Sequence, residues 1–180
     1  MTSAKGTVMP RISWWTFALV AFLCGVSFAA DQRRQADVAS RGVDVMPFRL
    51  DATTHVFTKT ATGGTQRVVA KDPTDAVQTG LVRRHLRELQ SKFRSGNFDG
   101  PTHIHGGDMP GLAALVAAKP GEIRISYRNV AGGAELTYQP ASADLVESLH
   151  AWFDAQLADH GADAMAGHDH EHMHDRTAPK

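Results

Sequence analysis

Two stretches of the chain, residues 53–93 and 122–157, follow the same order: an extended segment, a glycine pair, a second extended segment and an amphipathic helix. The glycine pairs suit tight turns between antiparallel strands, and they are Gly63-Gly64 and Gly132-Gly133. The pattern predicts an α+β fold, a two-layer sandwich whose four-stranded antiparallel sheet carries two main helices on one face, as a ββα–ββα pseudo-repeat. Two hairpin-helix units of independent origin would give the same pattern.

Apolar periodicity places the individual elements. Ile123, Ile125 and Tyr127 alternate with polar residues, which is typical of a strand with one wet face. The two helices are expected to begin at residues 72–75 and 140–142 and to end at Gly96 and Gly161. Their apolar stripes comprise Val82, Leu86, Leu89 and Phe93 in the first, and Leu145, Val146, Leu149, Trp152, Phe153 and Leu157 in the second.

The segment between the two halves, residues 97–111, is dense in glycine and proline. That composition predicts a loop without regular structure. Residues 112–118 follow as a short helix, bounded by Pro110 and Pro120.

The first 30 residues look like an export signal. Lys5 and Arg11 precede an apolar run over residues 14–23 that is short for a membrane span, and Ser27-Phe28-Ala29 supplies the small residues that a signal peptidase reads. We predict cleavage near Ala29 or Ala30, with an uncleaved membrane anchor as the alternative. The expected organisation is a signal peptide over 1–30, a polar linker over 31–49, an α+β domain over 50–161 and a disordered, His- and Met-rich metal-binding tail over 162–180.

Composition excludes several classes of function. The chain has 19 basic and 19 acidic side chains and no basic face with interleaved aromatics, so nucleic acid is not an expected partner. Its one cysteine, Cys24, lies in the export segment, so a processed chain would have no thiol. The sequence contains no G-x-S-x-G, P-loop, H-E-x-x-H or C-x-x-C-H motif.

The tail is the clearest chemical signal. It has a histidine at every second position, with acidic residues between them and Met165 and Met173 nearby: His168, His170, His172 and His174. Imidazoles at this spacing can wrap around one cation, and thioether sulfur favours copper over zinc or nickel. A chance low-complexity end and an expression tag are the alternatives.

Candidate ligands also lie within the expected domain. His103 and His105 flank one residue in the Gly- and Pro-rich loop, which also supplies Asp108 and Met109. In an extended segment both imidazoles would face one cation. In the alternative reading, one histidine caps the next helix and the other only bonds across a turn.

His150 falls on the apolar stripe of the last helix, with Asp154 one turn further on to hold its tautomer. A histidine satisfied within the core explains the same facts. His85 is placed to meet His150 across the repeat axis, and His55 and His160 are placed to join either group. His160 also suits the helix C-terminus as a charged group.

The run His103–Pro110, with the last-helix sequence LVESLHAWFDAQLADHGADAM, resembles a family of short secreted bacterial proteins without an established activity, whose members are often labelled aspartate carbamoyltransferase. The genuine transferase carries Ser-Thr-Arg-Thr and His-Pro-x-Gln motifs, and this sequence has neither. We therefore judge the label wrong and do not carry that activity over.

The sequence thus favours a non-catalytic periplasmic protein that binds metal, with copper preferred, and acts in storage, delivery or tolerance. An envelope metal transporter or oxidase would be its partner. The alternative is a secreted small-molecule binder or enzyme with a pocket of His103, His105 and His150. A third reading is an envelope interaction module without a small ligand.

Overall fold

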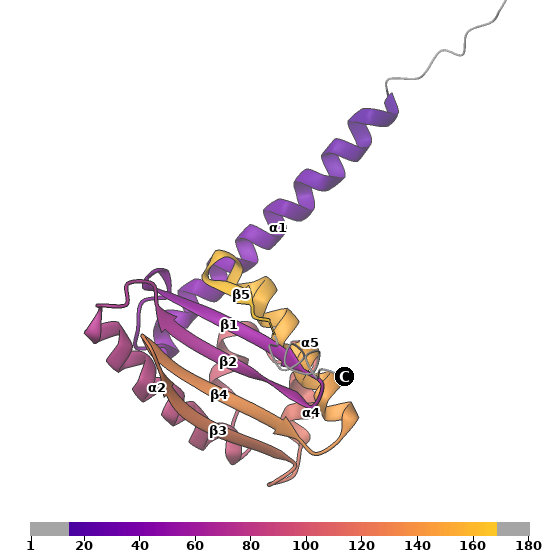
Figure 1. Ribbon diagram of the computed structural model, residues 1–180. Helices are drawn as coiled ribbons and strands as arrows, with labels where there is room; N and C mark the ends of the chain where they lie inside the picture. Colours follow the sequence, from indigo (N-terminus) through magenta and orange to yellow (C-terminus); the bar gives the residue numbers. More distant parts are fainter. Residues whose placement is uncertain (1–14, 169–180) are drawn as a thin grey trace, which may run out of the picture.

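The computed structural model describes the backbone of residues 15–168 and the side chains of residues 29–168. Figure 1 shows the elements, which follow the chain as α1 (Trp15–Val45), β1 (Thr53–Thr60), β2 (Gly63–Ala70), α2 (Ala76–Arg94), α3 (Asp99–His105), α4 (Leu112–Ala117), β3 (Ile123–Val130), β4 (Gly133–Pro140), α5 (Ala143–His160) and β5 (Ala164–Ala166). Short 3₁₀ turns, Leu50–Ala52 and Gly161–Asp163, precede β1 and β5. The expected α+β class is confirmed.

The sheet has the strand order β3-β4-β2-β1-β5. Its first four strands pair antiparallel, as expected, but β5 adds a parallel fifth strand beside β1, so the predicted four-stranded antiparallel sheet is incomplete. The missed strand is only three residues long, and a segment that short has no periodicity to recognise.

The pairing of the two halves is symmetric. Strands β3 and β4 begin at positions 123 and 133, each 70 residues after β1 and β2 at 53 and 63. At the junction Gln66 pairs with Leu136, which is also 70 residues further along the chain. The register therefore has the local twofold symmetry that a ββα–ββα arrangement requires.

Both main helices cover one face of the sheet (Figure 1). The side chains on that face are buried at alternate strand positions, among them Phe57, Val68, Ile125, Leu136 and Tyr138. The helices begin where expected: the Asp75 carboxylate accepts the Gln78 N–H at 2.9 Å, and the Ser142 hydroxyl accepts the Leu145 N–H at 3.3 Å.

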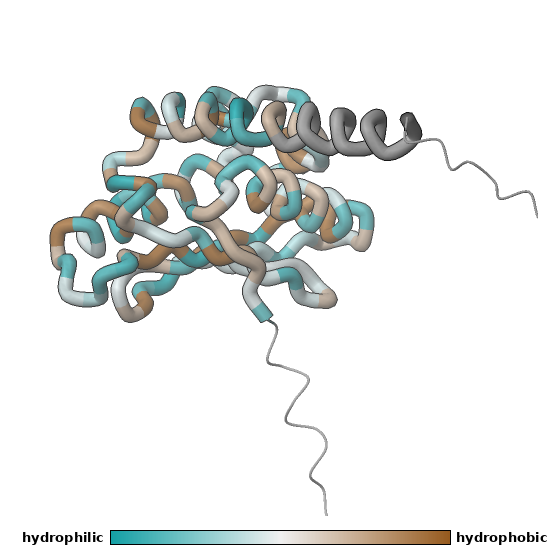
Figure 2. The backbone as a smooth tube through the Cα atoms, turned by 90° about the horizontal axis from the view of Figure 1, so that it is seen from above, coloured by the Kyte–Doolittle hydropathy of each residue, from teal (hydrophilic) through white to brown (hydrophobic). Residues whose placement is uncertain are grey.

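Helix α1 forms an additional layer, because it packs on α3 and α5 on the side away from the sheet (Figure 2). Val38 is fully buried, and Met46 and Phe48 join the core. Residues 31–49 are therefore part of the fold, and the predicted polar linker is wrong. Helix α1 also runs through the predicted cleavage position near Ala29. No helix within residues 15–168 is both long enough and apolar enough to cross a membrane.

Two further expectations are corrected. The Gly- and Pro-rich segment contains helix α3 over Asp99–His105, although it was expected to lack regular structure. Residues 162–166, assigned to the tail, form the end of the second 3₁₀ turn and β5. The short helix expected over 112–118 is confirmed as α4, which ends one residue earlier.

Candidate functional site: a buried histidine cluster

Four histidines from four elements line one cavity of about 40 Å³. They come from β1, α2, the end of α3 and the end of α5, and they are His55, His85, His105 and His160. Met46, Gln156 and apolar side chains complete the lining. The cavity exceeds the roughly 10–15 Å³ that one water molecule needs. We call these four residues the histidine cluster.

The sequence explains why each ring points inward. On β1, His55 shares its face with Thr53 and Phe57, since alternate residues of a strand point the same way. On α2, His85 lies between Val82 and Leu89 on the buried stripe. His105 and His160 are the last residues of their helices, and both helices end at this side of the molecule.

The His160 ring is the centre of the cluster. It stacks on His55 with ring centroids 4.8 Å apart and planes 7° from parallel, and it meets His105 edge-on at 5.0 Å. Phe48 contacts His55 at 5.9 Å and His85 at 5.5 Å. Three of the four imidazoles, those of His55, His85 and His105, are thus buried, and His160 is half-buried beside them.

A hydrogen bond to Asp159, which is itself paired with Arg34, holds His105 in place. Its Nδ1 lies 2.8 Å from Oδ2 of Asp159, a carboxylate that is 3% exposed. Arg34 of α1 binds both oxygens of that carboxylate and also donates to the His105 carbonyl at 3.2 Å. With Nδ1–H donating to Asp159, the Nε2 lone pair of His105 remains available, which is how a carboxylate orients a metal-binding imidazole.

Burial keeps the cluster neutral. It lowers the pKa of His85 and of His160 to about 4, with Lys92 adding to the shift at His85 and His105 to that at His160. Burial, followed by the neighbouring His160 and His85, holds the pKa of His55 well below its ordinary value. Burial also lowers the pKa of His105, although the Asp159 hydrogen bond opposes the shift. At neutral pH all four are uncharged, the form in which imidazole ligates metals.

One polar atom in the cluster lacks a partner. Among the described residues, no hydrogen-bonding group reaches Nδ1 of His55, whose side chain is 2% exposed. A buried donor or acceptor left unpaired costs about 1–3 kcal/mol. Such an atom beside a cavity indicates a place where a ligand can bind.

The other predicted ligands lie elsewhere. His103 is on the surface, 3.5 Å from Asp44, because residues two apart on a helix point about 200° apart, whereas an extended segment was expected. Met109 is buried in the core. The His150 Nε2 donates to the Gly63 carbonyl at 2.8 Å, and Asp154 pairs with Lys59 rather than with His150.

The structure therefore does not form the alternative pocket of His103, His105 and His150. It joins His105 to His160 and adds His55 and His85, and His85 does not meet His150. His55 and His85 were not identified as inward residues from the sequence, although the alternation of β1 and the stripe of α2 are the signals that could have done so. No local pattern connects Arg34 with Asp159, which lies 125 positions further along the chain.

His168, the first predicted tail ligand, is exposed and is the last described residue. The other tail ligands, His170, His172, Met173 and His174, lie outside the described residues. Among the side chains of residues 29–168, no three histidine, cysteine, aspartate or glutamate groups are arranged to hold one metal ion. The parallel stacking of His55 on His160 is one reason for the lack of such a ligand set, since the nitrogens of stacked rings point along parallel planes rather than toward one point.

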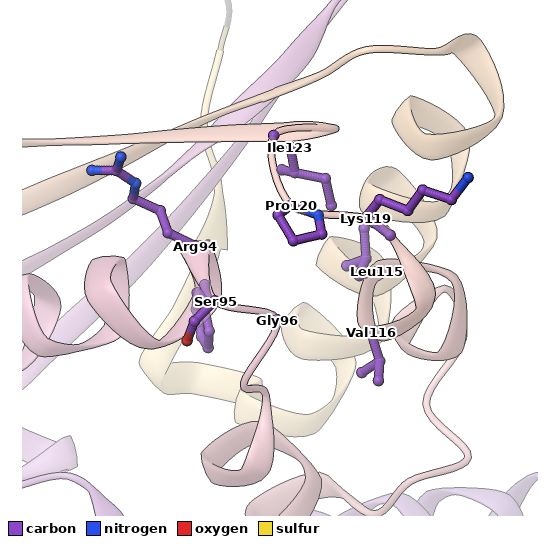
Figure 3. A pocket seen from close by; sticks show the side chains of 11 residues that line it. Arg94, Ser95, Gly96, Leu115, Val116, Lys119, Pro120 and Ile123 are labelled. Atoms are coloured by element: carbon purple, nitrogen blue, oxygen red, sulfur yellow. The ribbon is translucent and has the colours of Figure 1, made fainter.

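A larger cavity of about 150 Å³ lies between the end of α2, α4 and the start of β3 (Figure 3). Its lining combines apolar side chains with Arg94, Ser95 and Lys119, and Figure 3 shows the Arg94 guanidinium directed away from Leu115 and Pro120. No histidine, carboxylate or cysteine lines it, so it offers none of these metal ligands.

Comparisons of the chain with protein-family models, curated proteins and solved structures gave no match.

Proposed function

We propose that this chain is an exported transition-metal-binding protein, with copper as its preferred ion, that acts in storage, delivery or tolerance. The observation that supports this most directly is the histidine cluster, in which four neutral imidazoles from four elements line one cavity. Neutral imidazole is a good ligand for copper, zinc and nickel. Asp159 prepares one of the four, His105, by holding its Nδ1.

In this proposal the His-rich tail captures ions and the histidine cluster retains them. The tail follows β5 in the sequence, and it alternates imidazoles with acidic and thioether groups. The export-like N-terminal sequence supports a periplasmic location, with the leader cleaved or kept as an anchor, and a metal transporter or oxidase would then be the partner.

A small-molecule enzyme is the competing function, and the buried His105–Asp159 pair is the observation that favours it, because such a pair orients a general base. The size of the cavity argues against it. Pockets for organic ligands measure about 300–1,000 Å³. The space beside His105 is about 40 Å³, which suits an ion better than a substrate.

Metal titration of the full-length, untagged chain tests the proposal. The chain is first stripped with a chelator and then titrated at pH 7.4 with Cu(II), Zn(II) and Ni(II) in air and with Cu(I) under anaerobic conditions. We expect copper to bind at more than one equivalent. Failure of all four ions to bind at micromolar concentration would overturn the proposal.

Three full-length variants locate the bound ions. Alanine at His168, His170, His172 and His174 gives a variant that we call tail-silent, and it should retain about one equivalent of copper. Adding His160→Phe keeps an aromatic ring in the stack but removes its nitrogens, so the remaining equivalent should be lost. His103→Gln in the tail-silent chain is the control, since His103 is outside the cavity, and should change nothing.

A further inference from the structure

The histidine cluster has an unusual charge balance for a cation site. None of the residues that line its cavity is acidic, and the donors facing it are uncharged imidazoles, the Met46 thioether and the Gln156 amide. The nearby carboxylate, Asp159, is already neutralised by Arg34. An ion that enters the cavity therefore keeps its full charge, with no anion in the lining to offset it.

This lining discriminates between ions of different charge. The Born cost of moving an ion out of water rises with the square of its charge, so a divalent ion pays about four times as much as a monovalent ion of equal size. The side chains of His55 and His105 are each 2% exposed, so even a monovalent ion between them loses most of its hydration shell. A divalent ion would meet a still larger penalty.

Met46 is in a position to bind a soft ion. Its side chain lines the cavity and also lines an open groove of about 520 Å³ on the outside, formed with Ala39, Val43, Phe48 and other residues. Met46 thus lies between the surface groove and the imidazoles. Thioether sulfur selects monovalent copper among the first-row metals.

We propose that the cavity binds monovalent copper, Cu(I), through the thioether of Met46 and the imidazoles of His105 and His160, and that the ion enters past Met46. This inference rests on the proposed function and specifies the oxidation state of the ion. Cu(I) accepts few, neutral donors, so it does not need the set of three or more histidine or carboxylate ligands that the described residues lack. Binding requires the His160 ring to rotate out of the stack, so that a nitrogen reaches the ion.

The test uses the full-length tail-silent variant, which removes the competing tail histidines. Cu(I) is titrated anaerobically against the chromophoric chelator bicinchoninate, and Cu(II) and Zn(II) are titrated against chelators of known affinity. We expect one equivalent of Cu(I) to bind at least 100-fold more tightly than either divalent ion. X-ray absorption of the Cu(I)-loaded protein should show both sulfur and nitrogen neighbours.

A pair of methionine variants isolates the thioether. Met46→Leu keeps a side chain of similar volume and should weaken Cu(I) binding at least tenfold and remove the copper–sulfur signal. Met109→Leu is the matched control, because Met109 is equally buried but does not line the cavity, and it should leave binding unchanged.

The outcomes separate the two proposals. If the tail-silent chain binds Zn(II) or Cu(II) more tightly than Cu(I), or if its bound copper has no sulfur neighbour, the Cu(I) site is wrong while metal binding stands. If the unmodified full-length chain binds metal but the tail-silent variant does not, the Cu(I) site is also wrong. If no ion binds the unmodified full-length chain, both proposals fail.

Discussion

At the scale of single residues, the histidine cluster depends on a chain of polar contacts that begins at the surface and ends in the core. His105 depends on Asp159, which in turn depends on Arg34. The Asp159 carboxylate is buried, whereas about half of the Arg34 side chain is exposed, so the pair is partly screened by solvent. Its main role is to fix the His105 tautomer and to hold α1 against α5.

Replacing Asp159 by asparagine should destabilise the fold by about 2 kcal/mol, because it leaves Arg34 without its partner and removes the charged acceptor of His105. Urea unfolding at pH 7.5 measures the change. Asp154→Asn is the control: Asp154 pairs with Lys59 on the surface, where such a pair is worth about 0–1 kcal/mol. Equal effects of the two substitutions would contradict the role assigned to Asp159.

The stability of the metal-free protein should fall as the pH drops from about 6.5 to about 4. Burial lowers the folded-state pKa of His85 and His160 to about 4, whereas the unfolded histidines have a pKa of 6.5. In this window the unfolded chain binds protons that the folded chain does not, so each histidine adds a slope of up to about 1.4 kcal/mol per pH unit.

Urea unfolding in the presence of a chelator, at several pH values between 7.5 and 4.5, measures this slope. His85→Leu should make the dependence shallower by the contribution of one histidine. A stability that stays constant from pH 7.5 to 4.5 would mean that the cluster is not buried in solution.

At the scale of elements, α4 is held against α5 by one very close approach. Gly111, the residue before α4, has a φ of +77°, and a Cβ there would lie 1.9 Å from the Ser148 carbonyl oxygen. Only glycine satisfies both the dihedral angle and the distance. The contact places Leu112 and Leu115 of α4 in the core.

Gly111→Ala should therefore destabilise the protein by about 3 kcal/mol, from backbone strain and the forced separation of the two helices. Gly80→Ala is the matched control, because Gly80 lies within α2 with nothing near its Cβ position, and it should stabilise by about 0.5–1 kcal/mol. Thermal unfolding of both variants tests the pair, and stabilisation by Gly111→Ala would show that α4 does not pack on α5 in this way.

At the scale of the whole molecule, α1 joins the fold to the export-like N-terminal sequence. The described part of the helix supplies Arg34 and the fully buried Val38, and the segment after it supplies Met46 and Phe48. The histidine cluster is therefore completed by residues that precede the predicted domain. Its cavity would be open to water without them.

A chain that begins at Asp31 should keep cooperative unfolding, because it retains Arg34 and Val38. A chain that begins at Met46 should lose at least about 3 kcal/mol, since it removes one buried aliphatic side chain and the Arg34–Asp159 pair. Denaturant unfolding followed by circular dichroism compares the two. If both chains unfold at the same midpoint, α1 is not part of the folded unit.

Local patterns were sufficient for most of the elements. The alternation in β3, the glycine pairs and the apolar stripe of α2 each act over a few residues, so the sequence alone predicted the hairpins and both main helices. The same patterns failed where stability comes from distant contacts. The polar residues around Val38 form a helix because α3 and α5 cover one side of it, and β5 exists because β1 offers it a free edge.

For the candidate site, too, some features followed from local sequence patterns and others only from the packing of distant elements. The sequence alone predicted that the last helix ends at Gly161, and the period of β1 and α2 contains the signal that His55 and His85 point inward, because burial follows the period of each element. Only the tertiary structure decided that these histidines meet, that His103 and His150 do not join them, and that Arg34 holds Asp159 from 125 positions away. Sequence periodicity reports which side of an element is buried, whereas contacts between elements depend on how the helices and strands pack together.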